Sequence, residues 1–396
     1  MNRSPRGAIC VITSVHPPFD TRIFHKEAKT LGCAGYDVTL IARYTRDETI
    51  DGIRIVALPI PRNRFVRVFG LTWRTFRLAL RQRADVYHVH DPELLPIGAL
   101  LKLITRRKVI YDIHENVPAQ IRTKSWIPHS LRPAASLIYR LSERLLLRFV
   151  DVVVLAEDSY LPQYSHCEQV SVVHNYPLLR SPREKATPNT FRAVYVGGVT
   201  EQRGASTMLK AAASLNGRGI SVHWTVAGPI RPRDLEAKLR EAAVGIPRLD
   251  ILGPVPYEEA QKLISSAHVG LAVLKPIPNY IESLPTKLLE YMMAGIPVIA
   301  SDFPLWREIV EGSQCGLVVD PLDSGAIADA IESLMRHPEK AGEMGRNGRQ
   351  AVEEKYNWRQ EAARLLALYD VLLGGQGSKR LEAKACAATE LHHRSG

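Results

Sequence analysis

The sequence predicts an α/β protein with two successive doubly wound domains, each built around a parallel sheet. Short apolar runs rich in β-branched residues alternate with longer amphipathic stretches, as is typical of strands buried between helices. The alternation breaks once, at residues 176–190, where three prolines and several polar residues indicate a linker. The 396 residues suffice for two or three domains, at roughly 100–200 residues each.

The elements follow from this alternation in chain order. In the first half we expect strands at residues 8–13, 37–42, 53–58, 86–90, 108–113, 152–156 and 170–174. In the second half we expect strands at residues 192–196, 222–227, 249–252, 269–273, 297–300 and 316–319. Helices are expected between them, for example at residues 24–34, 133–148, 205–215, 257–266 and 286–294.

These elements give the expected domain limits. The first domain is predicted at residues 1–180 and the second at 191–357, with ligands binding in a cleft at the carboxyl ends of the strands. A last helix at 358–373 is expected to cross back to the first domain, although its sequence suits either one. The tail at 374–396 is small, polar and basic, and is predicted to be disordered.

Composition excludes several classes of protein. Hydrophobic residues make up 45% of the chain and charged residues 23%, which excludes wholesale disorder and collagen. The five cysteines are odd in number and lack CxxC spacing, so neither a disulfide framework nor a structural zinc site is expected. The apolar run at 8–13 is cut short by Pro17-Pro18 and predicts a strand rather than a signal peptide. We therefore expect a cytoplasmic protein.

The positive charge is concentrated in the first half. The whole chain carries +11; residues 1–180 hold 26 basic and 16 acidic residues, or +10, which leaves 26 basic and 25 acidic residues, or +1, for residues 181–396. Such an excess indicates an anionic partner, such as nucleic acid, a membrane surface or a phosphorylated ligand.

The segment at residues 282–298 carries the most information about chemistry. Pro285 suits the first turn of a helix, which places Glu282 before the helix and Glu290 about one turn inside it. The N–H groups of Thr286 and Lys287 would then form an anion site at the helix start. Taken alone, two carboxylates at this spacing favour a capped surface helix with solvated glutamates.

Two glutamates separated by seven residues and followed by the Ala-Gly-Ile-Pro turn at 294–297 resemble the signature of the family 4 retaining glycosyltransferases. The resemblance implies the GT-B fold, in which two Rossmann-like domains face each other across a cleft. It implies that Glu282 contacts the donor sugar near the reacting carbon and that Glu290 binds the ribose of the nucleotide. Leu284, which stands where the family has a glycine-rich stretch, Thr286 and Lys287 would also contact the donor.

A glycine-bearing loop after a predicted strand supports the resemblance. Gly197 and Gly198 would let the backbone approach a phosphate, and Arg203 would pair with it. The family has a second cation where this chain has Gly198, and Lys287 or Arg22 would compensate. An ordinary strand-to-helix turn explains the loop as well when it is taken alone.

Two strand ends in the first half carry polar side chains. His88, His90 and Asp91 suggest a metal site, but the sequence shows no third clustered ligand, and no metal is expected. By resemblance, His90 would lie beside the donor sugar. His114 and Glu115 are candidates for the acceptor pocket or a general base, or they belong to an ordinary polar loop. Arg22, after the first strand, is a candidate to reach a donor phosphate.

Residues 62–83 hold seven arginines and no acidic residue. An apolar helical stripe runs through Phe65, Phe69, Trp73, Phe76 and Leu80, and Arg67, Arg74 and Arg81 recur on another face. This pattern is typical of a helix on an anionic membrane, although the aromatic residues could instead pack into the core. Zinc-finger spacing and aromatic RNA-binding strands are absent from the sequence, so nucleic acid is not expected.

Together with these observations, the resemblance implies a retaining hexosyltransferase of the bacterial surface-polysaccharide type. It would move a sugar from a nucleotide-diphosphate donor to a hydroxyl of a glycan or lipid-linked acceptor, at the inner face of the plasma membrane. No cofactor is expected, because protein cations would hold the diphosphate without a divalent metal. The alternatives are an epimerase-type nucleotide-sugar enzyme of the same fold and a non-catalytic protein that binds anionic surfaces.

Overall fold

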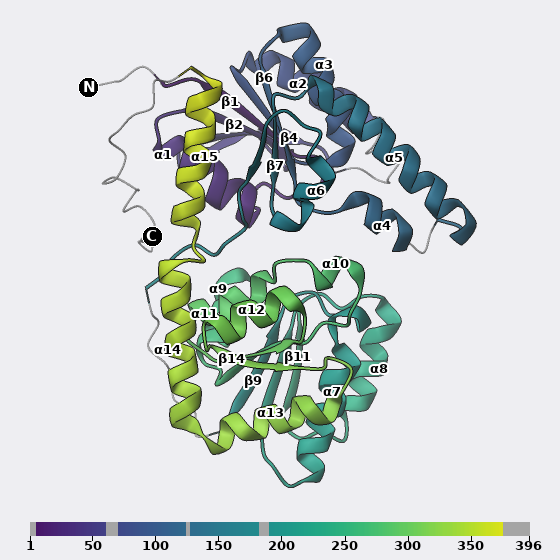
Figure 1. The fold of residues 1–396 in the computed structure, drawn as a ribbon, viewed down its shortest axis with the longest axis vertical. Coiled ribbons are helices and arrows are strands. Elements are labelled where there is room, and N and C mark those ends of the chain that lie inside the picture. The colour runs from purple at the N-terminus through teal and green to yellow at the C-terminus, as the bar shows by residue number, and fades with distance from the viewer. Residues whose placement is uncertain (1–4, 61–69, 124–126, 182–189, 375–396) are drawn as a thin grey trace. The chain divides into compact units, whose positions relative to one another are not determined.

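The computed structural model describes residues 5–60, 70–123, 127–181 and 190–374 of the chain. The chain forms two compact units, both of them α/β (Figure 1). Unit 1 comprises residues 1–175 together with the segment from Trp358 onward, and unit 2 comprises Tyr176–Asn357. The expected disordered tail at 374–396 lies, apart from Gly374, outside the described residues.

The sheet of unit 1 has the order β3-β4-β2-β1-β5-β6-β7-β8 within the described residues. Its strands are β1 (Ala8–Ile12), β2 (Asp37–Arg43), β3 (Glu48–Ile50), β4 (Ile53–Leu58), β5 (Val86–Val89), β6 (Lys108–Ile113), β7 (Val152–Leu155) and β8 (Val170–Val172). All neighbours pair in parallel except β3 and β4. β3 was not predicted, although the Asp51-Gly52 turn that precedes β4, with positive φ at both residues, is a recognised hairpin signal.

Helices cover the sheet of unit 1. They are the π-helix η1 (Thr21–Ala28), α1 (Lys29–Cys33), α2 (Thr72–Gln82), α3 (Leu95–Thr105), α4 (Val117–Thr123), α5 (Arg132–Leu146), α6 (Leu161–Tyr164) and α15 (Trp358–Leu372). α15 packs against η1 and α1, and the indole nitrogen of Trp358 donates to Thr30 Oγ1 at 3.0 Å. The final helix is therefore part of unit 1.

The sheet of unit 2 is wholly parallel within the described residues, with the order β11-β10-β9-β12-β13-β14. Its strands are β9 (Arg192–Val196), β10 (His223–Ala227), β11 (Leu249–Gly253), β12 (Val269–Ala272), β13 (Val298–Ser301) and β14 (Gly316–Val319). Its helices are α7 (Ala205–Gly217), α8 (Arg233–Ala243), α9 (Tyr257–Ser265), α10 (Pro278–Ile281), α11 (Thr286–Met293), α12 (Pro304–Gly312), α13 (Ser324–Arg336) and α14 (Pro338–Glu354).

The predicted fold class is confirmed: each unit is a parallel-sheet α/β domain, and every strand expected from the sequence is present. The strand order reverses beside β1 in unit 1 and beside β9 in unit 2, because each lies between two strands that follow it in the chain. Loops at the carboxyl ends of strands at such points are where open α/β sheets bind ligands.

No helix in the described part of the chain combines the length and apolar character needed to cross a bilayer.

Candidate functional site

In the loop that follows β9, the backbone of Gly197 and Gly198 lies close to two cationic side chains. Gly197 has φ +136°, and a Cβ at this position would lie 2.8 Å from Nζ of Lys287. A Cβ on Gly198 would lie 3.2 Å from Nη1 of Arg203. Both glycines therefore leave room for two cationic side chains, one from α11 and one from the short 3₁₀ helix Glu201–Arg203.

These two cations lie against tyrosines rather than carboxylates. Nζ of Lys287 lies 4.8 Å from the ring centroid of Tyr195, and Nε of Arg203 donates to the hydroxyl of Tyr280 at 3.4 Å. Burial and then the charge of Arg203 lower the pKa of Lys287 to about 7, against a smaller opposing effect of Glu290. Two neighbouring cations that repel each other are arranged for an anion, whose binding would remove the repulsion.

The start of α11 adds backbone donors to this site. The helix begins at Thr286, so Pro285 is the N-cap residue rather than a residue of the first turn, one position from the prediction. Its side chain caps no N–H group, because proline has no acceptor to offer. The N-terminal turn therefore presents the positive end of the helix dipole at Thr286 and Lys287.

The two glutamates lie where the sequence places them. Glu282 is exposed and directly follows α10, while Glu290 is half-buried and is the fifth residue of α11. Trp306, fully buried, fixes the loop between them by donating its indole N–H to the carbonyl of Ser283 at 2.8 Å. Leu284 is half-buried and packs against the core around α11. Within unit 2, Lys287 and Arg203 meet at the Gly197-Gly198 loop, and the other predicted donor-binding residues of this unit lie on α11 or in the loop directly before it. Arg22 and His90, which were also expected near the donor, lie in unit 1.

α11 is held on the sheet through Tyr291. The backbone N–H of Val196 donates to its hydroxyl at 3.1 Å, and its ring occupies space that a side chain at Gly270 would fill, since a Cβ there would approach within 2.3 Å. This packing sets the position of Lys287 relative to the loop after β9.

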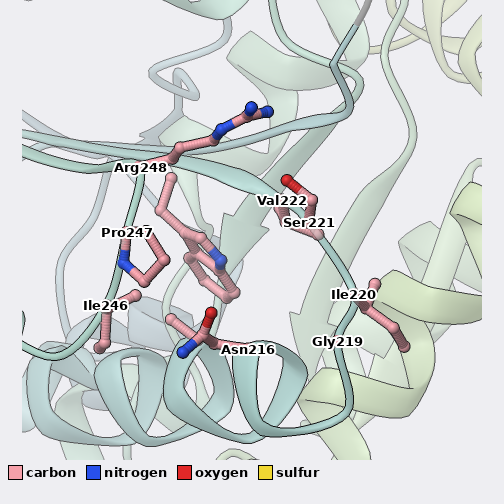
Figure 2. Close-up of a pocket in the computed structure, with 10 residues that line it drawn as sticks. Asn216, Gly219, Ile220, Ser221, Val222, Ile246, Pro247 and Arg248 are labelled. Carbon is pink, nitrogen blue, oxygen red and sulfur yellow. The ribbon is translucent and has the colours of Figure 1, made fainter.

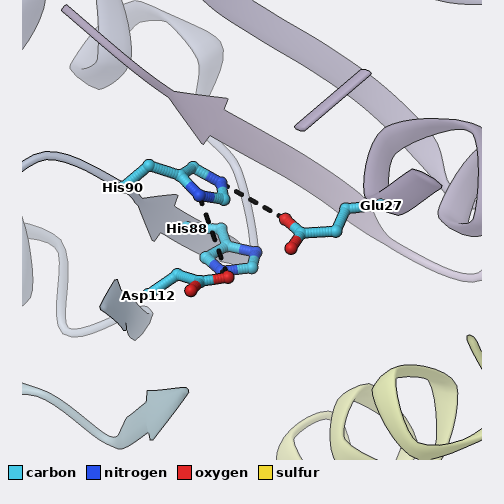
Figure 3. Close-up of side chains that lie close together, drawn as sticks. All are labelled: Glu27, His88, His90 and Asp112. Atoms are coloured by element: carbon cyan, nitrogen blue, oxygen red, sulfur yellow. Dashed lines mark ion pairs between the residues drawn. The ribbon is translucent and has the colours of Figure 1, made fainter. Parts of the chain in front are cut away.

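Unit 1 has a different cluster beside β1, β5 and β6. Glu27, His88, His90 and Asp112 meet in the interior (Figure 3), and all four side chains are fully buried. Arg22 lies among them: its Nε is 2.9 Å from Glu27 Oε1 and its Nη2 donates to Asp112 Oδ2 at 2.9 Å.

The prediction that Arg22 reaches a ligand is therefore corrected. Its guanidinium is 3% exposed, pairs with both carboxylates and donates from Nη1 to the carbonyl of Val173 at 2.7 Å. A buried cation needs such partners because desolvation is costly, and their presence turns Arg22 inward.

The cluster also corrects the expectation that no third ligand joins the histidines. The four residues of Figure 3 each offer an atom within 4.8 Å of the others, as metal ligands would. However, Arg22 already contacts both carboxylates, so the positive charge that they require comes from the protein. We describe the arrangement as a buried ion-pair cluster.

Protonation in the cluster follows from burial and charge. Burial alone would raise the pKa of Asp112, but the Arg22 guanidinium and nearby histidines hold it well below its usual range. Burial and then the charge of Asp112 raise the pKa of Glu27 well above its ordinary value. Burial and then His88 lower the pKa of His90, and burial lowers that of His114 to about 4.

The histidines form a line from the interior to the surface. His88 Nδ1 lies 2.9 Å from the hydroxyl of Tyr369, and His90 Nδ1 lies 3.0 Å from His114 Nε2. The side chain of His90 has no exposed area, whereas that of His114 is 18% exposed. Glu115 is exposed and accepts a hydrogen bond from Gln120. His114 and Glu115 are therefore the members of this strand end that solvent reaches.

A pocket in unit 2, whose lining Figure 2 shows, lies at the amino ends of β10 and β11, whereas the loop after β9 follows the carboxyl end of its strand. Trp224 near the start of β10 and Arg248 just before β11 line it, with α7 on one side. Arg248 is the only charged residue in the described lining. Because parallel sheets bind ligands at the carboxyl ends of their strands, we assign no catalytic role to this pocket.

The basic segment at 62–83 is described from residue 70 onward, so Arg67, Phe65 and Phe69 lie outside the described residues. In α2, Phe76 is buried in the core whereas Trp73 is 56% exposed. Arg74 and Arg81 are exposed. The predicted aromatic stripe is thus divided between core and surface.

Sequence reasoning missed four residues that complete these sites: Glu27, Asp112, Tyr195 and Tyr280. A signal existed for Asp112 and Tyr195, because a polar group inside a continuous apolar strand needs a partner. Glu27 and Tyr280 become informative only through contacts with Arg22 and Arg203.

Two family models of known proteins match this chain, and each covers most of one unit. Residues 180–351 match the family model described as "Glycosyl transferases group 1", and residues 21–164 match the "Glycosyl transferase 4-like domain". The chain is 25% identical over 365 residues to a phosphatidyl-myo-inositol mannosyltransferase of Mycobacterium leprae, covering 89% of this chain and 92% of that one.

Two solved structures share the fold. A sucrose-phosphate synthase of Thermosynechococcus elongatus superposes with TM-score 0.76 at 20% identity, covering 94% of this chain and 100% of that one. Anabaena HepE, solved in complex with UDP and glucose, superposes with TM-score 0.70 at 14% identity, covering 92% and 100%. The chain belongs to the glycosyltransferases of the GT-B fold, with a 4-like domain in unit 1 and a group 1 domain in unit 2.

Proposed function

We propose that this glycosyltransferase is a retaining enzyme that takes a sugar from a nucleotide-diphosphate donor and places it on a hydroxyl of a glycan or lipid-linked acceptor. The observation that carries the proposal is the pair of cations, Lys287 and Arg203, beside the Gly197-Gly198 loop. Among the described residues, neither cation has a carboxylate within ion-pair distance. A diphosphate supplies the charge that this arrangement lacks.

Each site residue of unit 2 would have its own role in the transfer of the sugar. Lys287, Arg203 and the N-terminal turn of α11 stabilise the negative charge that develops on the departing diphosphate, and such electrostatic stabilisation is usually the largest catalytic contribution. Exposed Glu282, next to this turn, faces the positive character that develops on the sugar. Glu290, within the same helix, binds the ribose.

The proposal also bears on the expected role of His90 and on the need for a metal. His90 need not touch the sugar in this proposal, because its ring is enclosed by the cluster of unit 1. Since the protein supplies two cations at the diphosphate, we propose that transfer requires no divalent metal. A cytoplasmic enzyme of surface-polysaccharide synthesis, in peripheral contact with the membrane, fits the similarity to a lipid-modifying mannosyltransferase.

The test is a screen of nucleotide-diphosphate sugars with a membrane extract as acceptor, measuring nucleoside diphosphate release and the anomeric configuration of the product. Glu282→Gln should lower turnover at least about 100-fold, whereas Glu259→Gln, an exposed glutamate on α9, should leave it unchanged. Release without a glycosylated product would indicate an epimerase-type enzyme. Full turnover in Glu282→Gln would reject the assigned role.

A further inference from the structure

Helix α5 of unit 1 has its polarity inverted: the side chains that it buries are polar. Ser136 and Glu143 are its buried residues. Ser136 donates to the carbonyl of Pro118 at 2.9 Å, and Glu143 accepts hydrogen bonds from the hydroxyls of Tyr139 and Tyr164 at 3.1 and 3.3 Å. The contacts of Ser136 with Pro118 and of Glu143 with Tyr164 therefore help to hold this helix on unit 1, together with the packing of Leu146 against the core.

The outward side of α5 is apolar. Leu137, Ile138, Leu141 and Leu145 are 49%, 64%, 58% and 55% exposed. Residues 137, 141 and 145 follow one another at intervals of four and form a continuous stripe along the helix. Single exposed leucines are ordinary, but a stripe of this length marks an interaction surface.

The neighbouring helix adds to this apolar surface. α3 packs against α5 (Figure 1) and exposes Leu103 and Ile104 at its C-terminal end, at 59% and 55%. Exposed Arg106 and Arg107 follow directly. Apolar side chains next to arginines thus recur on two helices that contact each other.

Arginines accompany the stripe in register. Arg140, Arg144 and Arg148 each follow a stripe leucine by three residues. In α5 this spacing places Arg140 and Arg144 on the same side as the leucines, and Arg148 lies in the short 3₁₀ helix Leu147–Phe149 that continues α5. All three are exposed, and none forms an ion pair with a carboxylate among the residues that the structure describes. Glu143, the one acidic residue of α5, is buried.

We propose that α5 docks unit 1 on an anionic lipid bilayer, with the stripe of Leu137, Ile138, Leu141 and Leu145 entering the acyl boundary and the three arginines contacting lipid phosphates. An apolar face bordered by unpaired arginines fits a surface that is apolar beneath and negatively charged above. A protein partner or a second copy would cover the leucines without requiring this repeated charge. The benefit of docking, access to a lipid-linked acceptor, rests on the proposed function; the binding does not.

The sequence predicted a membrane-binding surface at residues 62–83, whereas the proposal places it on α5. In the described part of residues 62–83, Trp73 is the one large apolar side chain that α2 exposes strongly. α5 exposes four.

The test is cosedimentation of the full chain with vesicles of phosphatidylcholine, alone or mixed equally with phosphatidylglycerol. The triple variant Leu137→Ser/Leu141→Ser/Leu145→Ser should bind the mixed vesicles at least about tenfold more weakly than the wild type. Arg140→Gln/Arg144→Gln/Arg148→Gln should lose the preference for phosphatidylglycerol. The control Val244→Ser/Leu322→Ser/Val371→Ser removes residues at least as exposed from elsewhere and should bind like the wild type.

Three outcomes would overturn the proposal. One is wild-type vesicle binding by the serine variant of α5, and another is failure of the wild type to bind either vesicle. The third is a wild-type dimer, measured by light scattering, that this variant converts to a monomer, since the stripe would then bind a second copy. Vesicle binding needs neither donor nor turnover, so these results are separable from failure of the proposed transferase activity.

Discussion

Cationic side chains lie beside the central strand of both sheets, but they are compensated in opposite ways. In unit 1, Arg22 is enclosed by Glu27 and Asp112 and has no surface left for a ligand. In unit 2, Lys287 and Arg203 face tyrosine hydroxyls and each other, and the pKa of Lys287 falls to about 7. Location at a ligand-binding edge is thus not sufficient: a cation left without a carboxylate is available to bind, whereas a paired cation stabilises the fold.

The largest expected effect is on the stability of unit 1. Arg22→Met leaves two buried carboxylates without their cation and should lower the free energy of unfolding by about 3–5 kcal/mol. Urea denaturation followed by circular dichroism measures this loss. Arg81→Met, at an exposed arginine of α2, is the control and should change stability by less than about 0.5 kcal/mol. If both variants lost equally little unfolding free energy, the buried cluster would not require Arg22 for its stability.

The same change in unit 2 should affect binding instead of folding. Lys287→Met removes a cation that is repelled by Arg203, so stability should fall by no more than about 1 kcal/mol. Affinity for the nucleoside diphosphate of the accepted donor should fall about 10- to 100-fold, because a charge-assisted contact is lost. Isothermal titration calorimetry measures the affinity. A large loss of stability with unchanged affinity would reverse the comparison.

The pH dependence of binding tests the lowered pKa of Lys287. Above about pH 7 the free site holds a neutral amine, whereas a bound diphosphate favours the ammonium, so binding must take up a proton. Affinity should therefore decrease by up to about tenfold for each pH unit above 7.5. Lys287→Arg keeps its charge in this range and should bind independently of pH; a pH slope equal to that of the wild type would place the titrating group elsewhere.

The smallest expected effect concerns Glu143, a buried carboxyl that accepts hydrogen bonds from hydroxyls and has no ion pair with a cation among the described residues. Burial raises its pKa to about 7, against the opposing hydrogen bonds, so the folded protein binds the proton more tightly than the unfolded chain. Its contribution to stability is then present below about pH 4.5 and is lost as pH rises through 7. Glu143→Gln should stabilise the protein by about 1 kcal/mol at pH 8 and by less at pH 5, measured by thermal unfolding at both values.

The sequence by itself determined the α/β class, the strands of both sheets and the glycine-bearing loop that carries Arg203, whereas the approach of Lys287 to that loop was only an implication of the family resemblance. The class, the strands and the loop are local or periodic properties: buried parallel strands are continuously apolar, and strand-to-loop-to-helix segments place their glycines and cations at one edge of a sheet. The edge strand β3 was not predicted, because its three residues are too few to show an alternation of apolar and polar side chains.

Only the tertiary structure decided what the charged side chains face. Arg22 and Lys287 look equally suited to a phosphate in the sequence. Arg22, however, pairs with a helix residue and a strand residue that folding brings inward, whereas no carboxylate in the described part of the chain forms an ion pair with Lys287. The inversion of α5 is likewise a tertiary property, because the pattern of the helix shows an apolar stripe without showing which side is covered. Charge compensation and burial depend on contacts between distant segments, and periodicity along one segment does not encode them.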